Sequence, residues 1–547
     1  MPRFARLVVL IATFAFSALV AFGQPSSAAA QPGFRIVGTV IERGTNRALN
    51  HVLVTISPTE HRDLQLSCVT DASGRFAFTN LPLGKYSLEA QKRGETPQGY
   101  NEYDNYATAV AVGPGLDSEN LVFSMDVPGS ISGAVLDDEG DPVAQAQIWL
   151  FRKAVLSGKS QVFAAGTEST ESSGDFYFAH LAPGTYYVAV QGRPWYAQAV
   201  PQQQGTEGDA NQVSSELDVV YPVTYYSDSL DPASASPIVI SEGGSARIQL
   251  TVRAVPSVHV ELAGLDQQPN RGFGTTLFNA GPEGFLIPAN AQIFNLGNQQ
   301  EISGIAPGRY VLTMQSMAED RPESIGTKTL ELTGTSTLDV RDLPKTSLAG
   351  EITFEGNEHP NGPVEIQLSP MVQSYGGQTF AFGITKDGLL MAQGRQVMPG
   401  HYELQLVGAS GFYVKSLSAK GAKTSGNQID IAEGAAVHLS IVAAKGLTRV
   451  DGVALKDGNP IAGTMVLLVP QDLREATRFR RDQSDSDGTF SLFDVVPGRY
   501  TILAIDNGRD LEYQNPAVIR DYITQGEVVD IPLPTHAALK VNVQVRR

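Results

Sequence analysis

The most regular feature of the chain is an alternation of hydrophobic and polar positions that breaks at turns and then resumes. It is clearest in three stretches: FRIVGTVIERGTNRALNHVLVTI from Phe34, GSISGAVLDDEGDPVAQAQIWLF from Gly129 and TRVDGVALKDGNPIAGTMVLLV from Thr448. Alternation with a period of two, on both sides of a turn rich in Asp, Gly and Asn, predicts antiparallel strands with one buried face. No long amphipathic helical pattern follows residue 30. The pattern therefore predicts an all-β protein.

A second phrase follows each of these stretches: GRFAFTNLPLGKYSLEA from Gly74, GDFYFAHLAPGTYYVAV from Gly174 and GTFSLFDVVPGRYTILA from Gly488. Its alternating Phe or Leu positions are expected to fill a core. Its Pro-Gly pair is expected to form a tight corner, and its Tyr to open the next strand with the hydroxyl near the rim. Two fainter copies, EISGIAPGRYVLTM and QGRQVMPGHYELQL, keep the corner but lack the preceding Gly-x-Phe turn.

The spacing of the five corners indicates the size of the folding unit. Successive corner glycines are 92 to 124 residues apart; they are Gly84, Gly184, Gly308, Gly400 and Gly498. This period is too long for a solenoid repeat and matches one small β-sandwich per copy. The sequence thus predicts five tandem seven-stranded sandwiches of immunoglobulin-like or transthyretin-like type, over residues 31–127, 128–254, 255–345, 346–446 and 447–547. Five such units in series would form a rod.

The first thirty residues have the composition of an export signal. Arg3 and Arg6 precede an apolar run over residues 7–22, and small residues follow it. These features predict a signal peptide over residues 1–30, cleaved after Gly23 or after Ala30, with an uncleaved anchor as the less favoured alternative. No later apolar run reaches the ~18 residues that a transmembrane helix needs. We therefore expect a secreted or periplasmic protein without a transmembrane segment in the mature chain.

The motifs of the repeat also carry a family resemblance. The combination of G-x-V in the first strand, P-[VI]-A in the second, D-x-x-G-x-F and then L-x-P-G-x-Y resembles the carboxypeptidase regulatory-like domain. The resemblance is good for the first, second and fifth units and partial for the third and fourth. It implies a transthyretin-like sandwich related to collagen-adhesin B-type and starch-binding-like folds, in an exported bacterial protein. Because this fold hosts many roles, the resemblance says little about function.

Charge and cysteine content narrow the class of partner. The net charge is −17, which argues against nucleic acid or an anionic membrane as a partner, because both attract basic surfaces. The one cysteine, Cys68, cannot form an internal disulfide bond, and we expect a buried core residue rather than a reactive thiol.

The sequence lacks the common catalytic and metal-binding motifs. The eight histidines show no HxxE or HExxH spacing, and no G-x-S-x-G elbow, P-loop or dinucleotide fingerprint occurs. We therefore predict a protein without catalytic residues, cofactor or metal. The turn at Asp485 and Asp487 has part of the pattern of a calcium loop, but an ordinary polar turn is favoured.

Aromatic residues outside the core pattern are the best candidates for ligand binding. They lie in RPWYAQAV, in the tail YPVTYY and in QGYNEYDNYATAV; the candidates are Trp195, Tyr196, Tyr221, Tyr225, Tyr100, Tyr103 and Tyr106. Flat rings beside Asn, Gln and Asp suit carbohydrate, because apolar sugar faces stack on the rings and hydroxyls meet the polar groups. The alternative is that the tyrosines pack on sandwich edges and anchor long loops.

Three hypotheses of function follow. The first is an exported, non-catalytic protein that binds a polysaccharide or a cell-surface protein. The second is a structural spacer or assembly scaffold with no dedicated small ligand. The third, which we favour least, is an enzyme, either carbohydrate-active or a peptidase.

Overall fold

The computed structural model describes residues 33–198, 216–265, 272–296, 299–318, 321–356, 358–371, 379–391, 397–532 and 537–544. In this part of the chain, strands form five successive β-sandwiches, which we number 1 to 5. The one α-helix of the described residues is α1 (Pro516–Ile523), and four 3₁₀ turns are η2 (Pro232–Ser234), η3 (Pro282–Gly284), η4 (Val340–Asp342) and η5 (Ala476–Arg478). The predicted all-β fold of tandem sandwiches is confirmed. The predicted signal peptide lies outside the described residues.

Sandwiches 1 and 2 each pair a three-stranded sheet with a larger one. In sandwich 1 the sheets contain β4 (Arg75–Leu81), β1 (Phe34–Glu42) and β8 (Leu121–Met125), against β3 (Leu66–Val69), β2 (Leu53–Pro58), β5 (Gly84–Gln91), β6 (Gln98–Gly99) and β7 (Val110–Val112). In sandwich 2 they contain β12 (Asp175–Leu181), β9 (Gly129–Asp137) and β16 (Ser245–Val252), against β11 (Lys159–Ser169), β10 (Gln147–Leu156), β13 (Gly184–Gly192), β14 (Val219–Tyr225), β15 (Ile238–Ile240) and β17 (Val255–Pro256).

Sandwiches 3 and 4 also consist of two sheets each, and in sandwich 3 both sheets have four strands. Sandwich 3 contains β21 (Gln292–Leu296), β22 (Gln299–Ile305), β18 (Val258–Ala263) and β25 (Ser336–Asp339), against β20 (Leu286–Pro288), β19 (Gly272–Ala280), β23 (Gly308–Ala318) and β24 (Arg321–Leu332). Sandwich 4 contains β26 (Ser347–Phe354), β33 (Ala436–Lys445) and β30 (Phe412–Lys420), against β28 (Phe380–Gly383), β27 (Glu365–Pro370), β29 (Gly400–Val407), β32 (Gln428–Ile431) and β31 (Lys423–Ser425).

In sandwich 5 the two sheets are continuous, because the last strand pairs with strands of both. It contains β35 (Asn459–Pro460), β34 (Thr448–Lys456), β41 (Ala537–Gln544), β39 (Gly498–Ile505), β36 (Met465–Pro470), β37 (Arg480–Gln483), β38 (Thr489–Val495) and β40 (Glu527–Ile531). In every sandwich the first strand pairs parallel with a strand near the end of the unit: β1 with β8, β9 with β16, β18 with β25, β26 with β33 and β34 with β41. All five sandwiches therefore share this parallel pairing, although in sandwich 4 the third strand of that sheet, β30, pairs with β33 rather than with the first strand.

The repeated phrase forms the same corner in all five sandwiches. Each tyrosine hydroxyl donates a hydrogen bond to the backbone carbonyl oxygen four residues upstream, over 2.6 to 3.0 Å; the donors are Tyr86, Tyr186, Tyr310, Tyr402 and Tyr500. Each of these tyrosines is buried. The corner glycines have φ of +153° to +159°, a backbone conformation that other residues rarely adopt. The phrase is therefore a structural corner in every copy.

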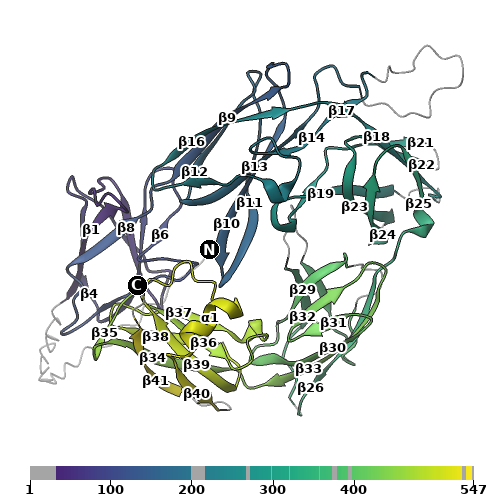
Figure 1. The fold of residues 1–547 in the computed structure, drawn as a ribbon. Coiled ribbons are helices and arrows are strands. Elements are labelled where there is room, and N and C mark those ends of the chain that lie inside the picture. Colours follow the sequence, from purple (N-terminus) through teal and green to yellow (C-terminus); the bar gives the residue numbers. More distant parts are fainter. Residues whose placement is uncertain are drawn as a thin grey trace, which may run out of the picture.

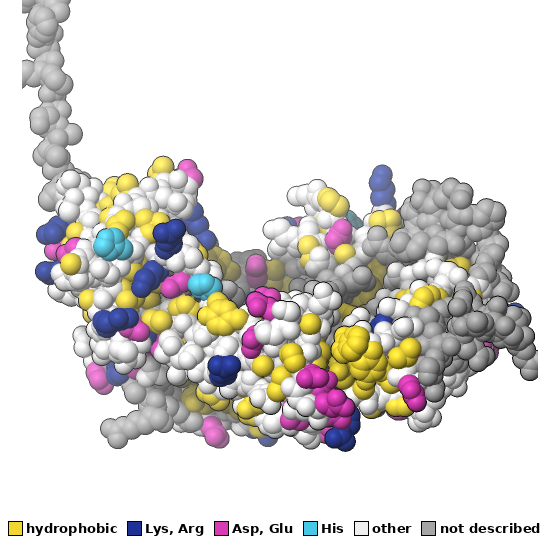
Figure 2. Space-filling model, turned by 90° about the horizontal axis from the view of Figure 1, so that it is seen from above, with side chains coloured by type: hydrophobic (Ala, Val, Ile, Leu, Met, Phe, Trp, Pro, Cys, Tyr) yellow, Lys and Arg dark blue, Asp and Glu magenta, His cyan; other side chains and the backbone are white. Residues whose placement is uncertain are grey.

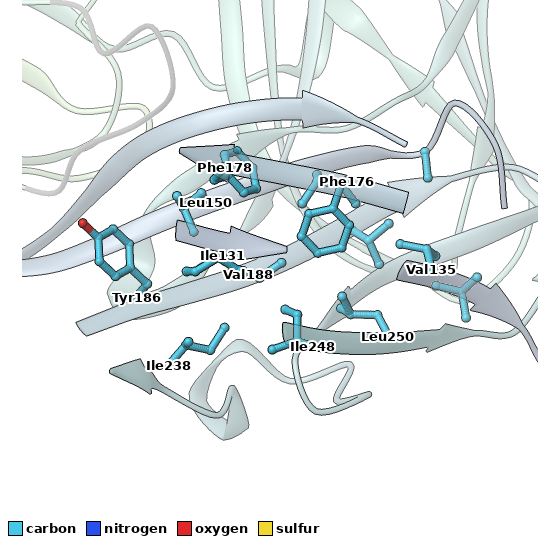
Figure 3. Close-up of a cluster of buried hydrophobic side chains, with 14 of the residues drawn as sticks. Ile131, Val135, Leu150, Phe176, Phe178, Tyr186, Val188, Ile238, Ile248 and Leu250 are labelled. Carbon is cyan, nitrogen blue, oxygen red and sulfur yellow. The ribbon is translucent and has the colours of Figure 1, made fainter. Parts of the chain in front are cut away.

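The predicted core positions are confirmed. In sandwich 2, Phe176 and Phe178 of β12 lie between the two sheets, and Tyr186 packs at one end of the cluster (Figure 3). The equivalent Phe or Leu positions of β4 and β38 are buried too. Cys68 lies partly buried against the core of sandwich 1, where burial raises the pKa of its thiol.

Sandwich 4 keeps the turn that its sequence was expected to have lost. The Gly388 N–H donates to the Thr385 carbonyl, and the Gly388 carbonyl accepts from the Ile352 N–H at 2.8 Å. Gly74 makes the same two kinds of bond in sandwich 1, with Asp71 and Val40. The expectation was wrong for this copy because leucines follow Gly388 where the other copies have phenylalanine. In sandwich 3 the β21–β22 hairpin precedes the corner instead.

The five sandwiches close into a ring rather than a rod. Figure 1 shows them following one another around a circle, so that sandwich 5 (yellow) lies beside sandwich 1 (purple). Direct hydrogen bonds join these two ends, among them one from the Tyr103 hydroxyl to Asp510 and one from Gln483 to the Asn101 carbonyl. The expectation of a rod was wrong because the sequence does not indicate the angle at which one sandwich joins the next.

We predict that the corner hydrogen bond contributes measurably to stability. Tyr186→Phe removes the donor and leaves the Ala182 carbonyl without it, which is expected to cost about 1 kcal/mol or more and to lower the melting temperature. Calorimetry of the full chain measures the shift. Tyr177→Phe, at an exposed position of the same sandwich, is the matched control and is expected to change nothing. Equal melting temperatures for both variants would contradict the assigned role.

Candidate functional site

The most elaborate polar cluster of the described residues lies where sandwiches 1, 2 and 5 meet. Its centre is the carboxylate of Asp104, on the loop between β6 and β7. Asp104 Oδ2 accepts from the Arg481 guanidinium of β37 at 3.0 Å and from the backbone N–H of Ser157 at 2.7 Å. The side chains of Asp104 and Arg481 are each only 3% exposed. Three sandwiches are thus tied to one buried carboxylate.

Two of the predicted binding tyrosines surround this ion pair. The Arg481 guanidinium lies 4.6 Å from the ring centroid of Tyr106 and 5.3 Å from that of Tyr103. Such cation–π contacts add about 0.5–2 kcal/mol, more when desolvated. Burial raises the pKa of both tyrosines, with the charge of Asp510 adding to the effect at Tyr103. Tyr100 instead packs on Phe123 of the sandwich 1 core, with ring centroids 5.7 Å apart.

The contribution of sandwich 2 comes from the tip of a long hairpin, β10–β11, which projects into the ring (Figure 1). Gly158 at the tip accepts a hydrogen bond from the Gln514 N–H of sandwich 5 at 3.0 Å. It has φ of +76°, and a Cβ there would lie 2.5 Å from the Tyr513 ring. Lys159 pairs with Glu403 of sandwich 4 at 3.2 Å. The hairpin tip therefore contacts sandwiches 1, 4 and 5.

A second ion-pair cluster also joins sandwich 1 to sandwich 5. Lys85, between the corner glycine and the corner tyrosine of sandwich 1, places its ammonium 2.5 Å from Asp485 and 3.4 Å from Asp487 of sandwich 5. These are the two carboxylates whose turn has the partial calcium-loop pattern. A lysine from another sandwich therefore supplies the positive charge at this turn.

Backbone groups complete the contact between the two ends of the ring. Ala109 donates to Asp485 Oδ1 at 3.0 Å and accepts from the Ser486 N–H at 2.9 Å, while Ala111 donates to the Ser486 hydroxyl at 2.7 Å. Gln483 donates to the Asn101 carbonyl and to the Thr108 hydroxyl. We call this whole contact between sandwiches 1 and 5 the seam.

The predicted aromatic residues of sandwich 2 are in three different environments. Tyr221 of β14 is 6% exposed and belongs to the sandwich core. Tyr225 is fully buried and donates to the Ala280 carbonyl of sandwich 3 at 2.9 Å. Trp195 is 95% exposed, and its ring meets that of Tyr196 edge to face at 5.7 Å. A Gln- and Gly-rich insert over residues 202–212 follows them in the sequence. It lies outside the described residues.

The rest of the described surface has fewer groups that are arranged to bind a ligand. No group of three or more His, Cys, Asp or Glu side chains is placed to hold a metal ion within the described residues. No helix in them is long and apolar enough to cross a membrane. An open groove of about 760 Å³ lies between sandwiches 4 and 5, with Glu403, Tyr413 and Arg478 in its lining. On the described part of the face in Figure 2, charges of both signs lie among hydrophobic side chains.

Lys85, Asp104 and Arg481 were not singled out from the sequence as site residues, and Asp485 was noted only for its partial calcium-loop pattern. Their partners are some 400 positions apart, and no spacing rule connects such positions. One signal was present: the loop QGYNEYDNYATAV places Asp104 between Tyr103 and Tyr106. A sequence pattern of tyrosines around a single carboxylate is compatible with a site for a buried cation as well as with a site for a sugar.

Comparison with known proteins agrees with this architecture. Residues 35–125 and 130–218 each match the model of the carboxypeptidase regulatory-like domain, as two tandem copies. The described residues of the first match lie in sandwich 1, and those of the second match lie in sandwich 2. No curated protein matches the chain.

Solved structures with distant similarity include two pilins and a protein of Bacillus anthracis. The Bacillus anthracis TIE protein is 14% identical, with a TM-score of 0.17, and the match covers 56% of this chain and half of that one. The minor pilin of Streptococcus agalactiae is 15% identical, with a TM-score of 0.22, over 41% of this chain and 97% of the pilin. The shaft pilin SpaA of Lactobacillus rhamnosus GG is 11% identical, with a TM-score of 0.19, over 41% and 98%. Because these TM-scores are so low, the assignment of the fold is based on the sheets described above.

We predict that Arg481→Ala loosens the seam. Breaking a buried ion pair leaves a charge without compensation, at a cost of about 3–5 kcal/mol. Amide hydrogen exchange should therefore become at least tenfold faster at Ala109, Ala111 and Ser157, whose N–H groups donate across the junction. Arg474→Ala, which removes an exposed pair with Asp472, is the control. Unchanged exchange at the seam in Arg481→Ala would contradict the role of this arginine.

A pH effect is expected beside the seam, at Asp482 of β37. Burial raises the pKa of its carboxyl to about 6, so the folded state binds a proton more tightly than the unfolded chain does. Its contribution to stability therefore grows as the pH falls from 7 towards 4, by on the order of 1–2 kcal/mol after solvent screening. Asp482→Asn removes the charge and keeps an oxygen for the Ser491 N–H. We expect a higher melting temperature than the wild type at pH 8 and a smaller difference at pH 5; an equal difference at both would contradict the assignment.

Proposed function

We propose that this chain is an exported, non-catalytic protein that binds a carbohydrate or a carbohydrate-bearing cell-surface partner, and that the ring is its rigid platform. The exposed Trp195 carries the proposal. A tryptophan that is 95% exposed leaves the largest apolar side chain in water, and Tyr196 supports its ring from one side. An aromatic ring held in this way is available to stack on a ligand.

The polar surroundings of Trp195 and Tyr196 fit the same kind of ligand. Burial first, and then the charges of Asp137 and Asp138 together with the nearby Tyr196 hydroxyl, raise the pKa of Tyr221 to about 12. The Tyr196 hydroxyl and the Asp137 and Asp138 carboxylates thus act electrostatically on the same buried group at this end of sandwich 2. They can accept and donate hydrogen bonds to sugar hydroxyls while the tryptophan ring covers an apolar sugar face.

The other five predicted aromatic residues enter this proposal differently. Tyr103 and Tyr106 contact Arg481 in the seam, Tyr100 and Tyr221 pack against sandwich cores, and Tyr225 bonds to sandwich 3. For Tyr103, Tyr106 and Tyr225 we propose a role in holding the ring, and for Tyr100 and Tyr221 a role in the sandwich cores, rather than in stacking on a sugar. The non-catalytic part of the proposal is supported by the lack of hydrolase, phosphate-loop and metal-binding motifs in the sequence.

A scaffold without a dedicated ligand is the second candidate. The observation that favours it is the number of loop residues that serve contacts between sandwiches, from the hairpin tip at Ser157 to the Lys85 cluster. In this case the ring itself would be the functional object, and its surface would serve assembly.

Retention on insoluble polysaccharides tests the proposal. We expect the mature full-length protein to bind at least one polysaccharide of a panel, and Trp195→Ala to weaken that binding at least tenfold, because it removes the stacking surface. Tyr177→Ala, at another exposed aromatic residue of sandwich 2, is the matched control and should bind like the wild type. If no polysaccharide retains the wild type, or if both variants bind equally well, the proposal is wrong and the scaffold is favoured.

A further inference from the structure

The junctions of the ring are of two physical kinds. Between sandwiches 2 and 3 the contact is apolar: Phe285 and Ile287 of sandwich 3 complete a buried cluster with Trp149 and Phe151 of sandwich 2, and the Phe151 and Phe285 rings lie 5.2 Å apart. Within the described residues, none of the buried hydrophobic clusters includes side chains from both sandwich 1 and sandwich 5. The seam is held by ion pairs and hydrogen bonds instead.

Polar contacts of this kind are typical of surfaces that associate and dissociate, whereas apolar clusters resemble a domain core cut in two. The seam is also complementary in charge in both directions. Lys85 of sandwich 1 meets Asp485 of sandwich 5, and Asp104 of sandwich 1 meets Arg481 of sandwich 5. Two pairs of opposite polarity fix the orientation in which the surfaces meet.

The two halves of the seam belong to the first and last sandwiches of the chain. No covalent bond joins them directly, and the intervening sandwiches only hold them at a high effective concentration. Every contact that sandwich 5 makes with sandwich 1 of its own chain is equally available from sandwich 1 of another copy. Because the two surfaces differ, such contacts join copies head to tail, into a closed dimer or a longer array.

We propose that the seam is a self-recognition surface: in an opened ring, sandwich 1 of one copy binds sandwich 5 of a second copy through the Lys85–Asp485 and Asp104–Arg481 pairs. The partner is thus a second copy of this chain. The apolar junction between sandwiches 2 and 3 stays intact in this exchange. The hairpin tip then bonds to Asp104 within its own copy or leaves it as the ring opens.

Charge reversal in two separate variants tests this inference. Lys85→Asp places a carboxylate against Asp485 and Asp487, and Asp485→Lys places an ammonium against Lys85. Each variant alone opposes like charges in its own ring and equally between two identical copies. Size-exclusion chromatography with light scattering should therefore give the monomer mass for each.

The 1:1 mixture has a contact that neither variant can form alone. The unaltered Lys85 of the Asp485→Lys chain meets the unaltered Asp485 of the Lys85→Asp chain, so one seam of a mixed dimer is native. The second seam joins the two introduced charges, which have opposite signs. We expect the mixture to elute at twice the monomer mass, and to return to the monomer mass at high salt, since these pairs are partly exposed.

A mixture that stays at the monomer mass would overturn the proposal. The double variant Lys85→Asp/Asp485→Lys controls for misfolding, because it restores opposite charges within one chain. It is expected to be monomeric and to elute like the wild type. A double variant that elutes as an expanded chain would likewise overturn the assignment of this pair to the seam.

Discussion

The closed ring depends on the buried carboxylate of Asp104. It accepts one hydrogen bond from Arg481 of sandwich 5 and one from the Ser157 N–H at the hairpin tip of sandwich 2. Taking both ions of this pair out of water is costly, and the cost is offset only while the partners and the surrounding tyrosines stay in place. Loss of either charged partner leaves a buried charge without compensation. Sandwiches 1, 2 and 5 therefore all meet at this one carboxylate.

Closure also depends on a small difference between copies of the same corner. The residue between the corner glycine and tyrosine faces an acid on the adjacent strand in sandwiches 3, 4 and 5: Arg309 opposite Glu331, His401 opposite Asp430 and Arg499 opposite Asp530. In sandwich 1 the residue is Lys85, and the position opposite it is Ala111. Without an acid beside it, the ammonium reaches Asp485 and Asp487 of sandwich 5. A change in one cross-strand neighbour thus directs a local charge into a contact across the ring.

Much of each sandwich follows from its sequence, because the interactions that form it are local or repeat. Phe176, Phe178 and Tyr186 could be assigned to the core and the corner from alternation and turn residues alone. The turn at Gly388 was missed because leucine replaces phenylalanine after it, although the glycine itself makes the turn. The hydrogen bond from the corner tyrosine to the carbonyl four residues back was not predicted either. The sequence predicted only that the tyrosine hydroxyl lies near the rim of the sandwich.

The ring could not be predicted, since it is formed by pairs of residues that share no motif. Asp104 and Arg481 are 377 positions apart, and each has an ordinary sequence environment. The tyrosines beside Asp104 were noticed as a group and interpreted as a sugar-binding surface. In the structure, the rings of Tyr103 and Tyr106 instead make cation–π contacts with the Arg481 guanidinium. Whether such a set of aromatic residues binds a sugar or a buried cation depends on which side chain the neighbouring sandwich places beside it.

Small-angle X-ray scattering of the wild-type protein tests the central claim most directly. A sandwich of 100 residues has a radius of gyration of about 13 Å and is roughly 35 Å across, so a straight row of five would be about 170 Å long. For a closed ring, the distribution of interatomic distances should end far short of that length and match the curve calculated from the structure. A maximum dimension near the full length of the row would contradict closure.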